Sequence, residues 1–169
     1  MIIRDRAAGD APALEAIALE THHHDRYPKY LPDDLRSFIM EPDALGGWVA
    51  TEGARVVGHA ALHPRSGPPV MDVVLAATGL DEDRVAMVAR LLVAPGARRI
   101  GVGRALLERV TAEAVRLGRR LALDVVDEHV SAIALYERCG WLRVGRVDWS
   151  LPGGRPLREY VYLAPDPTR

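Results

Sequence analysis

The sequence predicts a mixed α/β fold, in which a sheet with both hairpin and crossover connections is covered by helices. Two observations lead to this prediction. Residues 48–63 contain two alternating apolar runs joined by a tight turn at Glu52–Gly53, which is a hairpin pattern. Residues 85–126 and 121–149 each place a helical pattern between two strand-like segments. A chain of 169 residues is the size of one domain, so we expect one domain over residues 1–169.

The N-terminal half is expected to begin with a strand and a capped helix. Gly9–Asp10 can cap that helix, and Leu14, Ile17, Ala18 and Thr21 share one of its faces. The prolines at positions 28 and 32 predict that the helical pattern is broken over His22–Pro32. The expected elements are a strand at Met1–Arg4, a short helix at Leu35–Met40 capped by Asp33–Asp34, strands at Trp48–Thr51 and Arg55–His63, and a helix at Val70–Ala77.

The C-terminal half contains the clearest helix of the chain, Gly101–Leu117. Its apolar residues recur at helical spacing, and Gly118 is a natural stop. Val85–Val93 is apolar enough for a central strand. The other expected elements are strands at Leu121–Val126, Trp141–Trp149 and Tyr160–Leu163, a helix at Ser131–Arg138, a turn at Pro152–Pro156 and a loose tail at Ala164–Arg169.

Composition excludes several classes of function. The net charge is -1, and aromatic residues make up 5% of the chain, so nothing predicts binding to nucleic acid or to an anionic membrane surface. No apolar run approaches the length of a membrane span, and the N-terminus lacks a signal core. Cys139 is the single cysteine, which rules out an internal disulfide and fits a reducing compartment. We therefore expect a cytoplasmic protein, and a homodimer remains open.

The segment between the central strand and the long helix predicts an anion site. A strand, a glycine-containing loop and a helix N-terminus present free N–H groups and a favourable dipole to a phosphate. Gly101 and Gly103 let the backbone approach closely. Leu106 stands where a Rossmann loop has its third glycine, and Val102–Gly103 replace the Lys and hydroxyl of a Walker A loop. Neither of these phosphate motifs therefore fits.

A third motif, R-x-x-G-x-G, is met by Arg98, Gly101 and Gly103, and at this point the chain resembles the GNAT family of N-acetyltransferases. The strand ending before Ala94–Pro95 is similar to the family's fourth strand. The later segment Ala132–Trp141 resembles its A-x-x-L-Y-E-K-x-G-F segment. The chain departs from the family pattern at Arg99, Ile100 and His129, where many members have Gly, a basic residue and Asn.

The resemblance implies a largely antiparallel, twisted sheet flanked by helices and a site for acetyl-CoA as acyl donor. By the family pattern, strand backbone would hold the pantetheine arm, and the loop with the helix start would surround the pyrophosphate. Tyr136 would be the catalytic acid that protonates the departing thiolate. The cofactor-binding residues implied in this way are Leu91, Leu92, Val93, Arg98, Arg99, Ile100, Gly101, Val102, Gly103 and Arg104.

The acceptor side is less defined by the sequence. His59, His63, Glu82 and Asp83 are candidate bases, and a base acting through water is an alternative because the central strand contains no carboxylate. The segment after the first helix, with His24, Tyr27 and Tyr30, is a candidate lining for the acceptor pocket, while consecutive histidines there do not predict a metal site.

The predicted reaction is transfer of an acetyl group from acetyl-CoA to an amine, by direct attack in a ternary complex and with a small-molecule acceptor. The alternatives are a non-catalytic acyl-CoA sensor and an acetyltransferase of a protein N-terminus or of tRNA. The sequence leaves open the acceptor, the length of the acyl group and the role of His129.

Overall fold

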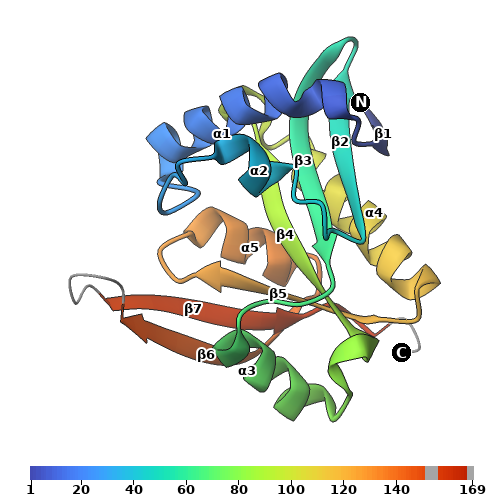
Figure 1. Cartoon of the computed structure of the whole chain (residues 1–169), viewed down its shortest axis with the longest axis vertical. Helices are drawn as coiled ribbons and strands as arrows, with labels where there is room; N and C mark the ends of the chain where they lie inside the picture. Colours follow the sequence, from blue (N-terminus) through green and yellow to red (C-terminus); the bar gives the residue numbers. More distant parts are fainter. Residues whose placement is uncertain (151–155, 167–169) are drawn as a thin grey trace. The chain divides into compact units, whose positions relative to one another are not determined.

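The computed structural model describes residues 1–150 and 156–166. It divides into two compact units, which are described separately (Figure 1). The first contains Met1–His63 and Ala89–Ala112, and the second contains Pro64–Val88 and Glu113–Arg169. Strand β4 (Val85–Val93) and helix α4 (Val102–Arg116) contribute residues to both units.

The first unit is built on an antiparallel meander. Strands β1 (Ile2–Asp5), β2 (Gly46–Glu52) and β3 (Arg55–His63) lie in the order β1-β2-β3, and β4 is the next strand beside β3. Val49 lies opposite His59 in the pairing of β2 with β3. A 3-10 turn, η1 (Ala8–Asp10), leads into α1 (Ala11–Asp25), which packs on β3 and on the short α2 (Leu35–Ile39) (Figure 1).

The second unit has the strand order β4-β5-β7-β6. Strand β5 (Arg120–Val126) is parallel to β4, with Met87 opposite Ala122 at the end of their register. It is antiparallel to β7 (Pro156–Leu163), which also pairs antiparallel with β6 (Leu142–Ser150). The remaining elements of this unit are α3 (Pro68–Thr78), η2 (Glu82–Arg84) and α5 (Val130–Arg138).

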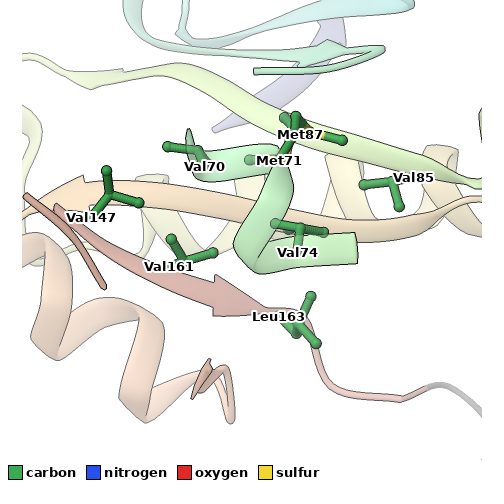
Figure 2. Packing of buried hydrophobic residues seen from close by; sticks show 9 residues of the cluster. Val70, Met71, Val74, Val85, Met87, Val147, Val161 and Leu163 are labelled. Atoms are coloured by element: carbon green, nitrogen blue, oxygen red, sulfur yellow. The ribbon is translucent and has the colours of Figure 1, made fainter. Parts of the chain in front are cut away.

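The core of the second unit lies between α3 and the sheet. Figure 2 shows Val70, Met71 and Val74 of α3 facing apolar residues of the strands, such as Val85 and Val161. Val74, Val85 and Val161 have no exposed surface. Gly145 of β6 allows the close approach of α3, because a Cβ placed there would lie 2.5 Å from Cγ1 of Val73. Burial of this apolar face stabilises the unit at about 25 cal/mol per Å2 of surface removed from water.

The fold class expected from the sequence is confirmed: the sheet is mixed and largely antiparallel, with helices flanking it. The expected helix at Val70–Ala77 is α3, and the N-cap of α2 is Asp34, whose Oδ1 accepts a hydrogen bond of 2.9 Å from the Ser37 N–H. The expected turn at Pro152–Pro156 and the end of the expected loose tail fall largely on residues 151–155 and 167–169, outside the described part of the chain.

Three local expectations were wrong. The helical pattern continues through His22–His24 to Asp25, because the steric effect of Pro28 reaches only the residue before it. The helix instead ends at Arg26, which adopts a left-handed conformation with φ 60°. The long helix, expected to extend to Leu117, ends at Arg116, and Leu117 is 36% exposed. Strand β7 begins at Pro156 and not at Tyr160, since pairing with β6 extends it through polar residues.

Among the described residues, no helix combines the length and apolarity needed to cross a bilayer.

Candidate functional site

The connection from β4 to α4 forms the predicted loop in the first unit. After β4, the Ala94 N–H donates to the carbonyl of Val57 (2.9 Å), and a 3-10 turn, η3 (Pro95–Ala97), reverses the chain. The N–H of Ala105 donates to the carbonyl of Gly101 (3.0 Å), which is an i to i−4 bond at the start of α4. The first-turn N–H groups of Val102, Gly103 and Arg104 precede the first i to i−4 donor of the helix, and N–H groups in this position can bind an anion.

The loop presents its backbone outward. Gly101 has φ 91°, and a Cβ added to it would lie in open space. A glycine is therefore favoured here by the backbone conformation and not by crowding. Arg99 adopts φ 65°, which is unusual for a residue with a side chain. Ile100 is 59% exposed, although it is apolar. These features give a strained, accessible turn directly before the helix N-terminus, as a site for a diphosphate requires.

Gly58 of β3 supports this loop from behind. A Cβ at this position would lie 2.9 Å from Cγ1 of Val102, 3.0 Å from the carbonyl oxygen of Leu92 and 3.1 Å from Cδ1 of Leu106. The end of β4 and the first turn of α4 therefore pack directly on the β3 backbone. No local sequence signal marks Gly58 as part of the site, because its contacts are with residues more than thirty positions away.

The side chain of Arg98 is engaged within the protein. Its Nη2 donates to Oδ2 of Asp25, and its Nε donates to the carbonyl of Val93 (3.3 Å). The hydrogen bond from Arg98 lowers the pKa of Asp25 below its ordinary value, so this carboxyl is ionised at neutral pH. The pair ties the C-terminal turn of α1 to the loop, and the backbone N–H of Arg98 donates to the carbonyl of Pro95 (3.4 Å).

Strand β4 is distorted just before its predicted cofactor-binding residues. Arg90 has φ 53° in the middle of the strand. Its side chain is held on several sides: Nε donates to the carbonyl of Phe38 (3.1 Å), Nη2 lies 3.3 Å from Oε2 of Glu41, and Cζ lies 3.8 Å from the centre of the Phe38 ring. A left-handed residue with a side chain costs about 1–2 kcal/mol and persists only where its surroundings fix it.

His59 lies beside this distortion and has no exposed surface. Its Nδ1 is 2.8 Å from the carbonyl oxygen of Arg90, and its Nε2 is 3.1 Å from Nη1 of Arg6. Burial is the main cause that lowers the pKa of His59 to about 4; the hydrogen bond to the Arg90 carbonyl opposes it, and the charges of Arg6, Arg90 and His63 add to it. Both ring nitrogens are engaged and the ring is neutral at pH 7, so His59 is a satisfied core histidine and a poor base.

His63 occupies the end of β3 and is 8% exposed. Its Nδ1 is 3.0 Å from Oε2 of Glu41, while its Nε2 is buried without a hydrogen-bond partner among the described residues. Burial lowers the pKa of His63, and Glu41 opposes this effect. Of the candidate bases, Glu82 and Asp83 lie in the short η2 turn of the other unit, and both are exposed.

Tyr136 lies on α5 in the second unit and is 6% exposed. Its ring packs at a tilt against Trp141 and Tyr162, with ring centres 6.0 and 6.1 Å apart. The hydroxyl of Tyr162 donates to Oε1 of Glu137 (3.0 Å), and burial raises the pKa of Tyr162. The aromatic cluster fixes the ring of Tyr136, and its role as catalytic acid stays a prediction.

The three predicted acceptor residues lie at the end of α1 and in the segment after it. His24 Nδ1 is 2.6 Å from Oδ1 of Asp25, whose other oxygen accepts the bond from Arg98. Tyr27 is half-buried, and Tyr30 is 49% exposed. Among the described residues, no group of three or more His, Cys, Asp or Glu side chains is placed to hold a metal ion.

A shallow pocket opens between α1 and α2 in the first unit. Apolar side chains, including Leu19 and Leu31, line it together with the carboxylates of Glu15, Asp33 and Asp34. Arg36 at its edge pairs with Glu15, with 2.5 Å between Nε and Oε1. The pocket therefore combines apolar surface with an excess of negative charge.

Comparison with known proteins identifies the family. Residues 11–141 match the family model described as the acetyltransferase (GNAT) family. The chain belongs to this family. The mycothiol acetyltransferase of Geodermatophilus obscurus is 32% identical over 127 residues. That match covers 71% of the present chain and 37% of the relative, so the chain spans little more than a third of the length of this curated protein.

Solved structures share the GNAT fold over nearly the whole chain. The ribosomal-protein-alanine N-acetyltransferase of Brucella melitensis has a TM-score of 0.74 and 24% identity, covering 96% of this chain and 98% of that one. Arabidopsis thaliana NAA60, solved in complex with acetyl-CoA, has a TM-score of 0.70 and 20% identity, covering 96% of each chain. These likenesses establish the fold.

Proposed function

We propose that the protein transfers an acetyl group from acetyl-CoA to an amine of a small-molecule acceptor, by direct attack in a ternary complex. The observation that carries the proposal is the exposed turn of residues 99–101 directly before the N-terminus of α4, in a member of an acetyltransferase family. A curated relative that is named as an acetyltransferase and a structure of the same fold with bound acetyl-CoA support acetyl-CoA as the donor.

The loop fits the diphosphate of the donor. The first-turn N–H groups of Val102, Gly103 and Arg104 point along the helix axis toward the loop, where the helix dipole favours negative charge. Gly101 has open space beside it, so the backbone can approach the phosphate oxygens. In this proposal Arg98 holds the loop in place, because its guanidinium is paired with Asp25 and its backbone N–H donates to the carbonyl of Pro95.

The end of β4 fits the extended arm of the donor. The register between β4 and β5 ends at Met87, before the segment Leu91–Val93 begins. Backbone N–H and C=O groups of an extended segment bind an amide-bearing chain in the way that a strand edge binds a peptide. Acetyl-CoA supplies the thioester that the acceptor amine attacks. Holding both reactants in one site lowers the barrier by making the attack effectively unimolecular.

Tyr136 is the proposed acid. Its ring is fixed by Trp141 and Tyr162, so its hydroxyl is held in one direction with little rotational freedom. A neutral phenol can donate its proton directly to a departing thiolate. The Glu41–His63 pair is the proposed route for the proton of the amine, acting through water, because burial lowers the pKa of His63 and its Nε2 has no hydrogen-bond partner in the described part of the chain.

The acceptor is proposed to carry a positive charge. The pocket between α1 and α2 is lined by Glu15, Asp33 and Asp34, and amines are cations at neutral pH. A panel for testing acceptors should therefore contain polyamines, amino acids and aminoglycosides, with a protein N-terminal peptide for comparison.

Thiol release from acetyl-CoA with this panel tests the proposal. We expect free thiol to appear only when both acetyl-CoA and an accepted amine are present, with an equal amount of acetylated amine found by mass spectrometry. Binding of acetyl-CoA without thiol release for any amine would favour the sensor alternative. Thiol release only with the N-terminal peptide would replace the small-molecule acceptor with a protein.

A further inference from the structure

We propose that His59 is a positioning residue that, together with Arg6, holds the β4 backbone in its left-handed turn at Arg90 and thereby directs the backbone groups of Leu91–Val93 toward the donor. This inference rests on the proposed function, since the same segment is proposed to bind acetyl-CoA. It adds a buried histidine and a half-buried arginine that no sequence motif assigns to the site.

The strain at Arg90 requires an explanation. A residue with a side chain at φ 53° inside a strand interrupts the regular alternation of the β4 backbone. Such conformations cost free energy and concentrate at functional sites, where the surrounding structure fixes them. Here the distortion immediately precedes Leu91, the first of the proposed donor-binding residues, so it determines where the following N–H and C=O groups point.

The hydrogen bonds around His59 define a single arrangement. A carbonyl oxygen only accepts, so the Nδ1–H of His59 donates to Arg90, at 2.8 Å. A guanidinium only donates, so Nε2 accepts from Nη1 of Arg6, at 3.1 Å. Arg6 Nη1 also donates to the carbonyl of Ile39 (2.5 Å), which anchors the relay at the end of α2. The relay thus runs from α2 through Arg6 and His59 to the carbonyl of the distorted residue.

Packing alone does not account for these residues. An apolar side chain would fill the space of His59 without burying a ring that has two polar atoms. Burying a guanidinium against a histidine has a desolvation cost that is offset only when each polar atom is paired. The side chain of Arg90 makes its own contacts with Phe38 and Glu41, whereas His59 bonds to its backbone carbonyl.

Two substitutions separate the two bonds of His59. The amide nitrogen of Asn stands near the position of Nδ1, so His59→Asn keeps a donor for the Arg90 carbonyl and loses the contact with Arg6. The side-chain carbonyl of Gln reaches the position of Nε2, so His59→Gln keeps an acceptor for Arg6 and loses the donor to Arg90. Both variants change the same buried position, which makes each the control for the other.

The readouts are the Kd for acetyl-CoA, kcat and KM with an accepted amine, and amide hydrogen exchange over residues 89–93 without ligand. We expect His59→Gln to raise the Kd about 10-fold and to speed exchange over residues 89–93, because the backbone carbonyl of Arg90 no longer accepts a hydrogen bond from residue 59. His59→Asn is expected to change the Kd less than about 3-fold. Val74→Ala, a core variant of the second unit, should lose stability with an unchanged Kd.

The inference would be overturned if the Asn and Gln variants lost the same affinity for acetyl-CoA and each loss followed the drop in melting temperature. His59 would then be a stabilising residue only. If wild-type protein binds no acetyl-CoA, the proposed function fails. Amide hydrogen exchange of the two His59 variants still tests the positioning role in that case, because it needs no ligand. Equal exchange rates over residues 89–93 in both variants would overturn that role.

Discussion

Replacing Gly58 with alanine should damage the loop from behind. The added Cβ would lie 2.9 Å from Cγ1 of Val102 and 3.0 Å from the carbonyl oxygen of Leu92. The Val102 methyl can shift by a few tenths of an ångström, but the carbonyl of Leu92 moves only if β4 moves. Overpacking of this kind costs about 1–3 kcal/mol. We therefore expect a loss of about 2 kcal/mol in the free energy of unfolding, or roughly 4–8 °C in melting temperature.

The same displacement should weaken donor binding. Relief of the contact requires Leu92 and Val102 to move away from β3, and these residues flank the 94–101 loop. We expect the Kd for acetyl-CoA, measured by titration calorimetry well below the melting temperature, to rise about 10-fold, equivalent to about 1.4 kcal/mol. Gly58→Val should lower the free energy of unfolding and raise the Kd for acetyl-CoA more than Gly58→Ala does.

Two glycines serve as matched controls. A Cβ at Gly9 or at Gly96 meets nothing within 4 Å, and neither residue has a left-handed backbone. Gly9→Ala lies outside the loop, and Gly96→Ala lies within it, so both should melt within about 2 °C of wild type. If Gly58→Ala has the same melting temperature as these controls and the same Kd for acetyl-CoA as the wild type, packing on β3 does not hold the loop in place.

Three further predictions concern single residues. Acid should destabilise the fold through His59: its pKa is 6.5 in the unfolded chain and about 4 when folded, so unfolding takes up a proton as the pH falls from 6.5 to 4. The free energy of unfolding should fall by about 3 kcal/mol across that window. In the His59→Asn variant it should depend less on pH between 6.5 and 4. An equal pH dependence in the variant and the wild type would show that the ring beside Arg6 and Arg90 does not titrate in this range. Arg99→Gly should be more stable than Arg99→Ala by about 1 kcal/mol in denaturant titrations, because only glycine relieves the φ of 65°, and equal midpoints would contradict strain there. Tyr136→Phe should lower kcat about 100-fold with the Kd for acetyl-CoA almost unchanged, and an unaltered kcat would exclude the acid role.

Periodicity and capping residues predicted most of the fold. The apolar stripe of α4, the alternating strands of the β2–β3 hairpin and the Asp34 cap of α2 are local signals, and the structure has these elements within a few residues of the expected bounds. The helix over His22–Asp25 was missed because the nearby prolines were given too long a reach. Strand β7 was expected to be too short because it begins with a proline and contains the charged Arg158 and Glu159, whereas its pairing with β6 extends it to Pro156.

The site was only partly accessible from the sequence. The glycines of the loop are a local motif, and Gly101 has the positive φ that such a motif requires. The left-handed Arg90 leaves no local signal, since arginine does not favour that conformation. The pair of Asp25 with Arg98, the relay through His59 and the packing on Gly58 all join segments far apart in sequence. Residue patterns carry no record of such contacts.

Amide hydrogen exchange with and without acetyl-CoA tests the central claim most directly, because it locates the bound donor on the chain. We expect slower exchange at Val102–Arg104 and at Leu91–Val93 when acetyl-CoA is present at about 100 times its Kd, together with about 2.7 kcal/mol of added stability. Protection of other segments, with these two unchanged, would contradict the assignment of the β4–α4 connection as the donor site.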